Sequence, residues 1–311
     1  MSVKQVGLIG FPVAHSLSPA MQQAAFDALG IAARYTLWET PPGDLEERVA
    51  SLRVPELLGA NVTIPYKEDV LPLLDECDAL AARVGAVNTI VNRAGRLVGY
   101  NTDVPGFSRA LAECLARHSS ERWPKKAVIL GTGGAARGAA VALLENGVEE
   151  LLLLGRTAAR VQALRDHLRA LAGKLPGTPA VYGGLLESDA ASEQSHQLSL
   201  YNGSLSGGDE TKRFLSSADV MVNATSIGLK ADTTDNASLL VDVNAFPATS
   251  LVMDMIFNPP QTSLLRAAQA RGCVTLNGLS MLVYQGALAF ELWTGHRAPL
   301  EIMREALGLL S

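Results

Sequence analysis

The sequence predicts an α/β protein with two domains, each built around a mainly parallel sheet. Short apolar runs alternate with segments of helical period, which is typical of βαβ units. The alternation begins twice, once at the N-terminus and again near residue 127. The chain has 311 residues, of which 48% are hydrophobic, so two sizeable cores are available.

The first half of the chain reads as alternating strands and helices followed by a hairpin. We expect strands at 6–9, 35–38 and 59–64, and helices at 18–29 and 44–51. Two apolar runs, 86–91 and 96–103, flank a turn that carries Gly95, which is typical of a β-hairpin. Such a hairpin would place Asn88 roughly opposite residues 100–102 and near Asp103.

The second half repeats the strand and helix pattern. We expect helices at 105–117 and 158–172, an Ala-rich helix at 139–145, strands at 127–130, 151–154, 220–224 and 251–255, and a terminal helix at 299–310. The segment 180–212 is rich in Ser, Gly, Gln and Asp, and we interpret it as an exposed or partly disordered insertion. We place the domain boundary near Pro105, so that the first domain spans 1–104 and the second 105–278.

Composition argues against several classes of partner. The formal net charge is −5 and there is no long Lys/Arg run, so we expect no nucleic-acid partner. No apolar stretch reaches about 18 residues, and the first ten residues do not resemble a signal peptide, so we expect a cytoplasmic protein without a membrane anchor. The five histidines and three cysteines are widely scattered, so we predict no metal site.

A glycine-rich turn follows the strand at 127–130 and predicts a dinucleotide site. Gly131 permits a tight turn, Gly133 allows close approach to a pyrophosphate, and small Ala136 allows the following helix to pack closely, which fits the pattern G-x-G-x-x-A. Gly134 and Ala135 belong to the same run, where the free amides of a helix start offer an anion site.

The end of the next strand predicts which dinucleotide binds. Enzymes that use NAD usually carry a carboxylate here for the ribose 2′-hydroxyl. This chain has Arg156 and Thr157 instead. A guanidinium and a hydroxyl suit a 2′-phosphate, so we predict NADP. The alternative is that Arg156 is a solvated loop charge and that Thr157 caps the helix starting at Ala158.

Polar side chains in the first domain predict a substrate site. Ser16 and Ser18 precede a helix that starts at Pro19, and their hydroxyls suit a carboxylate, although Ser18 could simply cap that helix. Asn61, Thr63 and Lys67 follow a strand at its carboxyl end, where ligands bind in open α/β sheets. The otherwise apolar hairpin adds the following polar residues: Asn88, Thr89, Asn101, Thr102 and Asp103. A buried aspartate needs a partner, and Lys67 is a plausible one.

Eight blocks in sequence order resemble the shikimate dehydrogenase family, which includes shikimate and quinate dehydrogenases. They are Ser-Leu-Ser-Pro at 16–19, Asn-Val-Thr-Ile-Pro-Tyr-Lys at 61–67, Gly-Ala-Val-Asn-Thr at 85–89, Asn-Thr-Asp at 101–103, the glycine run at 131–137, Asn-Ala-Thr-Ser-Ile-Gly at 223–228, Asp-Met-Ile-Phe-Asn-Pro at 254–259, and 277–287. The resemblance covers nearly the entire chain.

The resemblance implies a two-domain NADP-dependent oxidoreductase that interconverts 3-dehydroshikimate and shikimate in a cleft. It implies Lys67 and Asp103 as the catalytic pair. The implied substrate contacts are Ser16, Ser18, Asn61, Thr63, Asn88, Thr102 and Gln285. The implied cofactor contacts are the glycine run, Arg156 and Thr157, together with Asn223, Thr225, Met255 and Gly278. It also returns the helices of 279–311 to the first domain, and it implies a monomer or a homodimer.

Departures from the family pattern leave alternatives open. Phe257 stands where the family commonly has a substrate-contacting Tyr, and Gly155 replaces the Asn usual before Arg-Thr. A paralogue acting on quinate or on an amino-substituted shikimate is therefore one alternative. The other is a non-catalytic dinucleotide sensor on the same fold.

Overall fold

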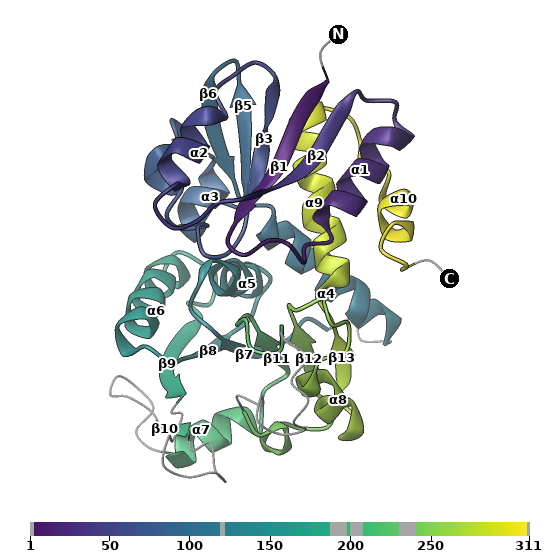
Figure 1. The fold of residues 1–311 in the computed structure, drawn as a ribbon. Coiled ribbons are helices and arrows are strands. Elements are labelled where there is room, and N and C mark those ends of the chain that lie inside the picture. The colour runs from purple at the N-terminus through teal and green to yellow at the C-terminus, as the bar shows by residue number, and fades with distance from the viewer. Residues whose placement is uncertain (1–2, 119–121, 187–197, 200–207, 230–240, 310–311) are drawn as a thin grey trace. The chain divides into compact units, whose positions relative to one another are not determined.

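The chain forms two compact units, shown in a computed structural model that describes residues 3–118, 122–186, 198–199, 208–229 and 241–309 (Figure 1). The first unit comprises Met1–Arg109 and Ser280–Ser311, and the second comprises Ala110–Leu279. Each unit contains its own sheet, covered by helices on both faces. The predicted fold class, a two-domain α/β protein, is confirmed.

The first unit is built on a mixed sheet of six strands in the order β2-β1-β3-β5-β6-β4. The strands are β1 (Lys4–Gly10), β2 (Ala33–Glu39), β3 (Leu57–Val62), β4 (Glu76–Cys77), β5 (Thr89–Arg93) and β6 (Arg96–Tyr100). β1 pairs in parallel with β2 and β3, whereas β5 pairs antiparallel with β3 and β6. The predicted hairpin is thus confirmed, and Thr89 lies opposite Tyr100.

Helices cover both faces of this sheet. α2 (Leu45–Ser51) and α3 (Ala79–Val84) bury apolar side chains on one face, and a single 3₁₀ turn, η1 (Leu71–Leu73), adds to that layer. α1 (Ser18–Ala28) and α9 (Leu279–Thr294) pack on the other face, where the rings of Phe26 and Phe290 lie 5.0 Å apart. The Trp293 indole also donates to the Ile90 carbonyl (2.9 Å), so α9 belongs to the core of the first unit.

The chain ends in a helix shorter than the sequence suggests. α10 (Leu300–Glu305) packs against α1 and is followed by a turn that carries Gly308 in the left-handed region, at φ +69°. Glycine adopts this conformation without the cost that other residues incur, which explains why the predicted helix at 299–310 ends early.

The second unit contains a seven-stranded sheet in the order β10-β9-β8-β7-β11-β12-β13. The strands are β7 (Lys126–Leu130), β8 (Glu150–Gly155), β9 (Ala180–Leu186), β10 (Leu198–Ser199), β11 (Val220–Asn223), β12 (Leu251–Asp254) and β13 (Val274–Leu276). All neighbours pair in parallel except β10, which runs antiparallel to β9. The six parallel strands follow the doubly wound order of dinucleotide-binding sheets, with the reversal between β7 and β11.

Helices again form a layer on each face of the second sheet (Figure 1). α5 (Gly134–Glu145) and α6 (Ala158–Ala172) lie together on one face. α7 (Gly208–Leu215), α8 (Ser263–Ala270) and the 3₁₀ turn η2 (Val243–Ala245) pack on the other, around a cluster that includes Leu130, Phe214 and Val252. The carboxyl ends of β7, β11 and β12 therefore open on one edge of a sheet that is buried on both faces.

The predicted polar insertion at 180–212 is partly wrong. Residues 180–186 form β9, which pairs with β8 from Ala180 to Leu185 and buries Val181 and Leu186. Within α7, the Thr211 side chain is also buried. The high polarity of the segment as a whole concealed a short apolar run, Ala-Val-Tyr-Gly-Gly-Leu-Leu, at its start. Residues 187–197 and 200–207 lie outside the described part of the chain.

Two helices begin earlier than predicted, and both starts bear on function. α4 (Asp103–Arg117) begins two residues before Pro105, because proline is tolerated in the first turn of a helix. The predicted boundary at 104/105 falls within this helix, which the two units share. α5 begins at Gly134 rather than at Ala139. Among the described residues, every helix is too short or too polar to cross a membrane.

Candidate active site

The backbone at Lys67 is held by neighbours on three sides. Beyond β3, the Tyr66 amide donates to the Thr63 carbonyl (2.9 Å), which closes a tight turn. The buried Tyr66 hydroxyl donates to the Thr40 carbonyl (2.7 Å), and the Val87 amide donates to the Lys67 carbonyl (2.7 Å). The strand end and the turn therefore fix the direction in which the lysine leaves the backbone.

Asp103 is placed by the end of the hairpin and the start of α4. The Asn101 side-chain oxygen accepts from the amides of Asp103 (3.1 Å) and Val104 (3.2 Å), and its amide group donates to the Ala86 carbonyl (2.8 Å). Asn101 thus satisfies the first amides of the helix, as capping residues do. Because Asp103 is the first helical residue, its carboxylate also lies at the positive end of the helix dipole.

Lys67 and Asp103 form an ion pair that is largely buried. The Lys67 Nζ lies 2.6 Å from Asp103 Oδ2, and their side chains are 13% and 5% exposed. Removing two charges from water is costly unless further hydrogen bonds satisfy them. The second carboxylate oxygen accepts from Asn88 Nδ2 (2.9 Å), which meets part of that need.

Asn88 connects this pair to two other predicted substrate residues. Its Nδ2 lies 2.9 Å from Thr102 Oγ1 and 3.3 Å from Gln285 Oε1, and its Oδ1 accepts from the Thr102 amide (2.7 Å). Gln285 in α9 is oriented by a bond from its own Nε2 to the Leu282 carbonyl (2.8 Å). The predicted proximity of Asn88 to Asp103 is confirmed.

A buried tyrosine that the sequence analysis did not single out extends the network to the start of α1. The Tyr35 hydroxyl donates to Asn61 Oδ1 (2.8 Å), and Asn61 Nδ2 lies within hydrogen-bond distance of the Asn88 carbonyl (3.1 Å) and of Thr89 Oγ1 (3.2 Å). Tyr35 also interacts with the buried Ser18 hydroxyl. Both ends of the Asn61 amide group are therefore engaged within the protein.

The interpretation of Ser18 as a helix cap is wrong. The N-cap position belongs to Leu17, and Ser18 is the first residue of α1. Instead, the Ser16 hydroxyl accepts the Ser18 amide (3.2 Å), which orders the two serines as a pair. Thr63 is half-buried beside Gly10, where any larger residue would collide with its methyl group.

In the second unit, the glycine-rich turn has the geometry that its sequence predicts. Gly131 has a φ of +113°, and a Cβ there would lie 3.0 Å from the Ala224 carbonyl oxygen. Gly133 occupies the N-cap of α5 without a capping side chain, and a Cβ added to it would meet nothing within 4 Å. Ala136 is fully buried. An open space in front of uncapped helix amides fits the pyrophosphate of a dinucleotide.

Arg156 and Thr157 follow β8 and are both exposed. Thr157 occupies the N-cap of α6, as the capping alternative predicts, but its hydroxyl makes no capping hydrogen bond. Gly155 is buried just before them, and a Cβ there would lie 2.9 Å from side chains of both Thr132 and Val161. An asparagine at position 155 would therefore require the side chains of Thr132 and Val161 to shift.

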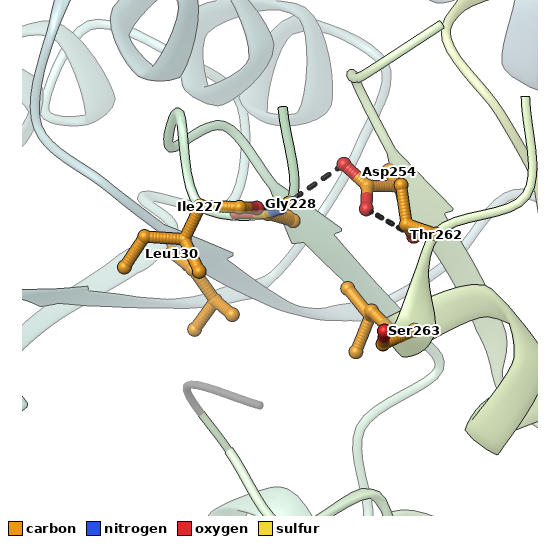
Figure 2. Close-up of a pocket in the computed structure, with 8 residues that line it drawn as sticks. Leu130, Ile227, Gly228, Asp254, Thr262 and Ser263 are labelled. Carbon is orange, nitrogen blue, oxygen red and sulfur yellow. Dashed lines mark hydrogen bonds between the residues drawn. The ribbon is translucent and has the colours of Figure 1, made fainter. Parts of the chain in front are cut away.

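The four remaining predicted cofactor residues cluster at the carboxyl ends of β11, β12 and β13. Asn223 ends β11, its side-chain oxygen accepts from Thr225 Oγ1 (2.7 Å), and its backbone carbonyl accepts the Met255 amide (2.9 Å). Gly278 donates its amide to the Ile256 carbonyl (3.0 Å). A small pocket adjoins this cluster, lined by Leu130, Asn223, Ile227, Gly228, Asp254, Thr262, Ser263 and Leu264 (Figure 2).

No described group of three or more His, Cys, Asp or Glu side chains could hold a metal ion. The chemistry available in the described residues is therefore that of an ammonium, a carboxylate and hydrogen-bonding side chains in the first unit. The second unit contributes a turn of dinucleotide-binding geometry with an exposed arginine.

Comparisons with known proteins identify close relatives. The model "Shikimate dehydrogenase substrate binding domain" matches residues 8–90, and "Shikimate 5'-dehydrogenase C-terminal domain" matches residues 278–307. A shikimate dehydrogenase (NADP(+)) of Symbiobacterium thermophilum is 42% identical over 97% of this chain and 92% of its own length.

Solved structures agree with these matches. Shikimate 5-dehydrogenase from Thermus thermophilus, in complex with NADP(H) and shikimate, is 34% identical with a TM-score of 0.74, covering 97% of this chain and 98% of its own. Quinate dehydrogenase from Corynebacterium glutamicum, in complex with NAD, is 32% identical with a TM-score of 0.80, covering 99% of both chains.

We predict that Tyr35→Phe changes how stability depends on pH. Burial raises the pKa of Tyr35 well above its ordinary value of 10.0, although the Ser18 hydroxyl acts in the opposite direction. Above pH 10 the unfolded chain releases this proton and the folded protein retains it. The folded state therefore loses stability as pH rises, with an extra slope of about 1.4 kcal/mol per pH unit.

Urea unfolding between pH 8 and pH 11 measures this slope for both proteins. The phenylalanine variant should lack the extra slope, and at pH 8 it should be less stable by about 1–3 kcal/mol, because Asn61 Oδ1 loses its donor. Identical slopes in the two proteins would contradict the prediction.

Proposed function

The chain belongs to the shikimate dehydrogenase family, and we propose that it reduces 3-dehydroshikimate reversibly to shikimate with NADPH. The observation that carries this proposal is the ion pair between Lys67 and Asp103, which is hydrogen-bonded to a network of buried amide and hydroxyl groups. The same chain has a glycine-rich turn followed, one strand later, by an exposed arginine. The family's NADP-bound and shikimate-bound members support the choice of ligands.

In this proposal the first unit holds the substrate. The hydroxyls of Ser16 and Ser18 bind the ring carboxylate. The ring hydroxyls are contacted by Thr63, Asn88, Thr102 and Gln285. Asn61 belongs to the same set of substrate-binding residues. The ordering of the two serines by the bond from the Ser18 amide to the Ser16 hydroxyl supports a site prepared before the substrate arrives.

Lys67 acts on the oxygen of the ketone. When bound, NADPH supplies a hydride to carbon C3, and the electron pair of the C=O π bond moves to oxygen. The Lys67 ammonium stabilises the developing alkoxide and gives it a proton, which leaves a neutral amine that solvent reprotonates. Asp103 orients Lys67 and accepts a hydrogen bond from the neighbouring substrate hydroxyl. A direct acid-base role for Asp103 is the alternative assignment.

In the second unit, we assign Gly131, Gly133, Gly134, Ala135 and Ala136 to the pyrophosphate. Arg156 and Thr157 take the 2′-phosphate, which distinguishes NADP from NAD. Asn223, Thr225, Met255 and Gly278 contact the remainder of the dinucleotide. The open space in front of Gly133 and the exposure of Arg156 support these assignments.

The biological setting follows from the reaction. We propose a role in chorismate and aromatic amino acid biosynthesis, in the cytoplasm, as a monomer or a homodimer. The net charge of −5 supports the absence of nucleic acid from the set of partners.

A quinate or aminoshikimate dehydrogenase is the second candidate function. The similarity to a quinate dehydrogenase across 99% of both chains and the presence of Phe257 in place of tyrosine favour it. A non-catalytic dinucleotide sensor is a weaker candidate, because a sensor has no use for the buried Lys67–Asp103 pair.

Absorbance at the reduced nicotinamide band, with shikimate or quinate and NADP or NAD, tests the proposal. We expect kcat/KM to be highest for shikimate with NADP. Higher kcat/KM with quinate would support the second candidate. Tight NADPH binding without turnover on either polyol would support the sensor.

Lys67→Ala should lower kcat by about 10²–10⁴-fold and raise the KM for shikimate far less, because the proton donor acts mainly in the transition state. Steady-state kinetics at saturating NADP measures both constants. Lys174→Ala, which removes an exposed lysine from the second unit, serves as the control and should keep the wild-type kcat. Full kcat in the Lys67 variant would remove the assignment.

Arg156→Ala should raise the KM for NADP by about 10–100-fold and leave the KM for NAD within about threefold, since only NADP carries the 2′-phosphate. The ratio of the two constants reports the effect, and the Lys174→Ala protein again provides the reference. Equal losses with both cofactors would argue that Arg156 does not contact the 2′-phosphate.

A further inference from the structure

Asp254 is a fully buried carboxylate to which the mechanism assigns no role. It ends β12, beside Asn223 at the end of β11, where the two parallel strands pair in register. Figure 2 shows its two oxygens pointing in different directions, one toward Thr262 and the other toward the end of β11. An ionisable group in such a place needs partners for both oxygens.

Three donors from three segments meet this carboxylate. Oδ1 accepts from Asn223 Nδ2 (3.0 Å) and from the Ile256 amide (3.1 Å), and Oδ2 accepts from the Thr262 hydroxyl (2.7 Å). Burial raises the pKa of Asp254, and the three hydrogen bonds act in the opposite direction. An ionised carboxylate only accepts hydrogen bonds, so it suits three donors better than an amide of the same shape.

The bond to Asn223 determines the conformation of the loop after β11. With its Nδ2 directed to Asp254, Asn223 presents Oδ1 to the amide (3.1 Å) and the hydroxyl (2.7 Å) of Thr225. The Thr225 hydroxyl in turn accepts the Ile227 amide (3.2 Å). Asp254, together with the Ile227 carbonyl that accepts from the same Nδ2 at 3.3 Å, therefore fixes which end of the Asn223 amide group faces Thr225.

The bond to Ile256 determines the conformation of the loop after β12. The Ile256 carbonyl accepts the Gly278 amide (3.0 Å), and a Cβ on Gly278 would lie 2.2 Å from the Met255 carbonyl oxygen. The Met255–Ile256 peptide is thus held between Asp254 and Gly278 with no room for another atom. One carboxylate consequently connects the segments that carry Asn223, Thr225, Met255 and Gly278.

We propose that Asp254 is a positioning residue for NADPH. Asp254 holds the loops after β11 and β12 in the conformation that binds the dinucleotide. The inference rests on the proposed function, because it takes Asn223, Thr225, Met255 and Gly278 as cofactor contacts. Asp254 is fully buried and both of its oxygens accept from protein donors, so it acts through Asn223 and the Met255–Ile256 peptide.

The test compares Asp254→Asn and Asp254→Glu with a matched control, Thr262→Val. The control also breaks a hydrogen bond of the same carboxylate, and it removes the N-cap of α8, but it keeps the bonds to Asn223 and Ile256. Nicotinamide fluorescence measures the Kd of NADPH, thermal melting measures stability, and steady-state kinetics gives the KM of shikimate.

We expect both Asp254 variants to raise the Kd of NADPH about tenfold and to leave the KM of shikimate within about twofold. Thr262→Val should lower Tm by about as much as the Asp254 variants do, but it should keep the Kd of NADPH within about twofold. A merely structural role would instead move Kd in parallel with Tm in all three proteins.

Several results would overturn the inference. These are a wild-type Kd in the Asp254 variants, an equal loss of affinity in Thr262→Val, or failure of both Asp254 variants to fold where Thr262→Val folds. Wild-type protein that does not bind NADPH would instead refute the proposed function, and the inference with it, so its Kd is measured first.

Discussion

The buried ion pair between Lys67 and Asp103 is the constraint on which the first unit depends. The Lys67 and Asp103 side chains are 13% and 5% exposed, so their charges have lost most of their hydration. Burying them is costly unless surrounding groups replace the hydrogen bonds to water. Asn88 supplies a hydrogen bond to Asp103, Thr102 orients Asn88, and the Asn101 side chain holds the backbone from which Asp103 projects. The hydrogen bonds that offset the desolvation cost of these charges also hold them in a single geometry, which catalysis requires.

The second unit meets a similar problem in a similar way. Asp254 ends β12 and Asp103 begins α4, and each carboxylate has its oxygens directed to donors from separate segments. The difference lies in the partner. Asp103 faces an ammonium that can act on a ligand, whereas the donors to Asp254 among the described residues are neutral, which suits Asp254 to orienting backbone and amide groups. Charge placement thus separates a group suited to chemistry from a group suited to positioning.

The local features of both sites could be predicted from sequence. The glycine spacing at 131–136 permits the conformation it adopts, because Gly131 takes a positive φ without a steric penalty and Gly133 has no side chain to fill the open space beside it. The hairpin was predictable because two apolar runs flank a turn that carries Gly95, and the structure confirms that the hairpin brings Asn88 to Asp103. Membership of the family, carried by eight blocks along the chain, was likewise visible without coordinates.

The missed features depend on contacts between segments distant in the chain. Tyr35 lies in a strand where a tyrosine is an ordinary residue, and only the tertiary structure brings its hydroxyl to Asn61. The sequence analysis assigned no role to Thr262, or to Asp254 although it begins one of the eight blocks, since their bond is evident only when β12 and α8 are assembled. The strand at 180–186 was hidden because its apolar run is short, and its pairing with β8 is what makes it a strand. Sequence alone therefore determined the fold class, the nucleotide turn and the chemical types of the candidate catalytic groups, because backbone conformation and side-chain chemistry are local properties. The tertiary structure decided which polar groups are buried and what each one bonds, because burial and partnership are properties of the assembled chain.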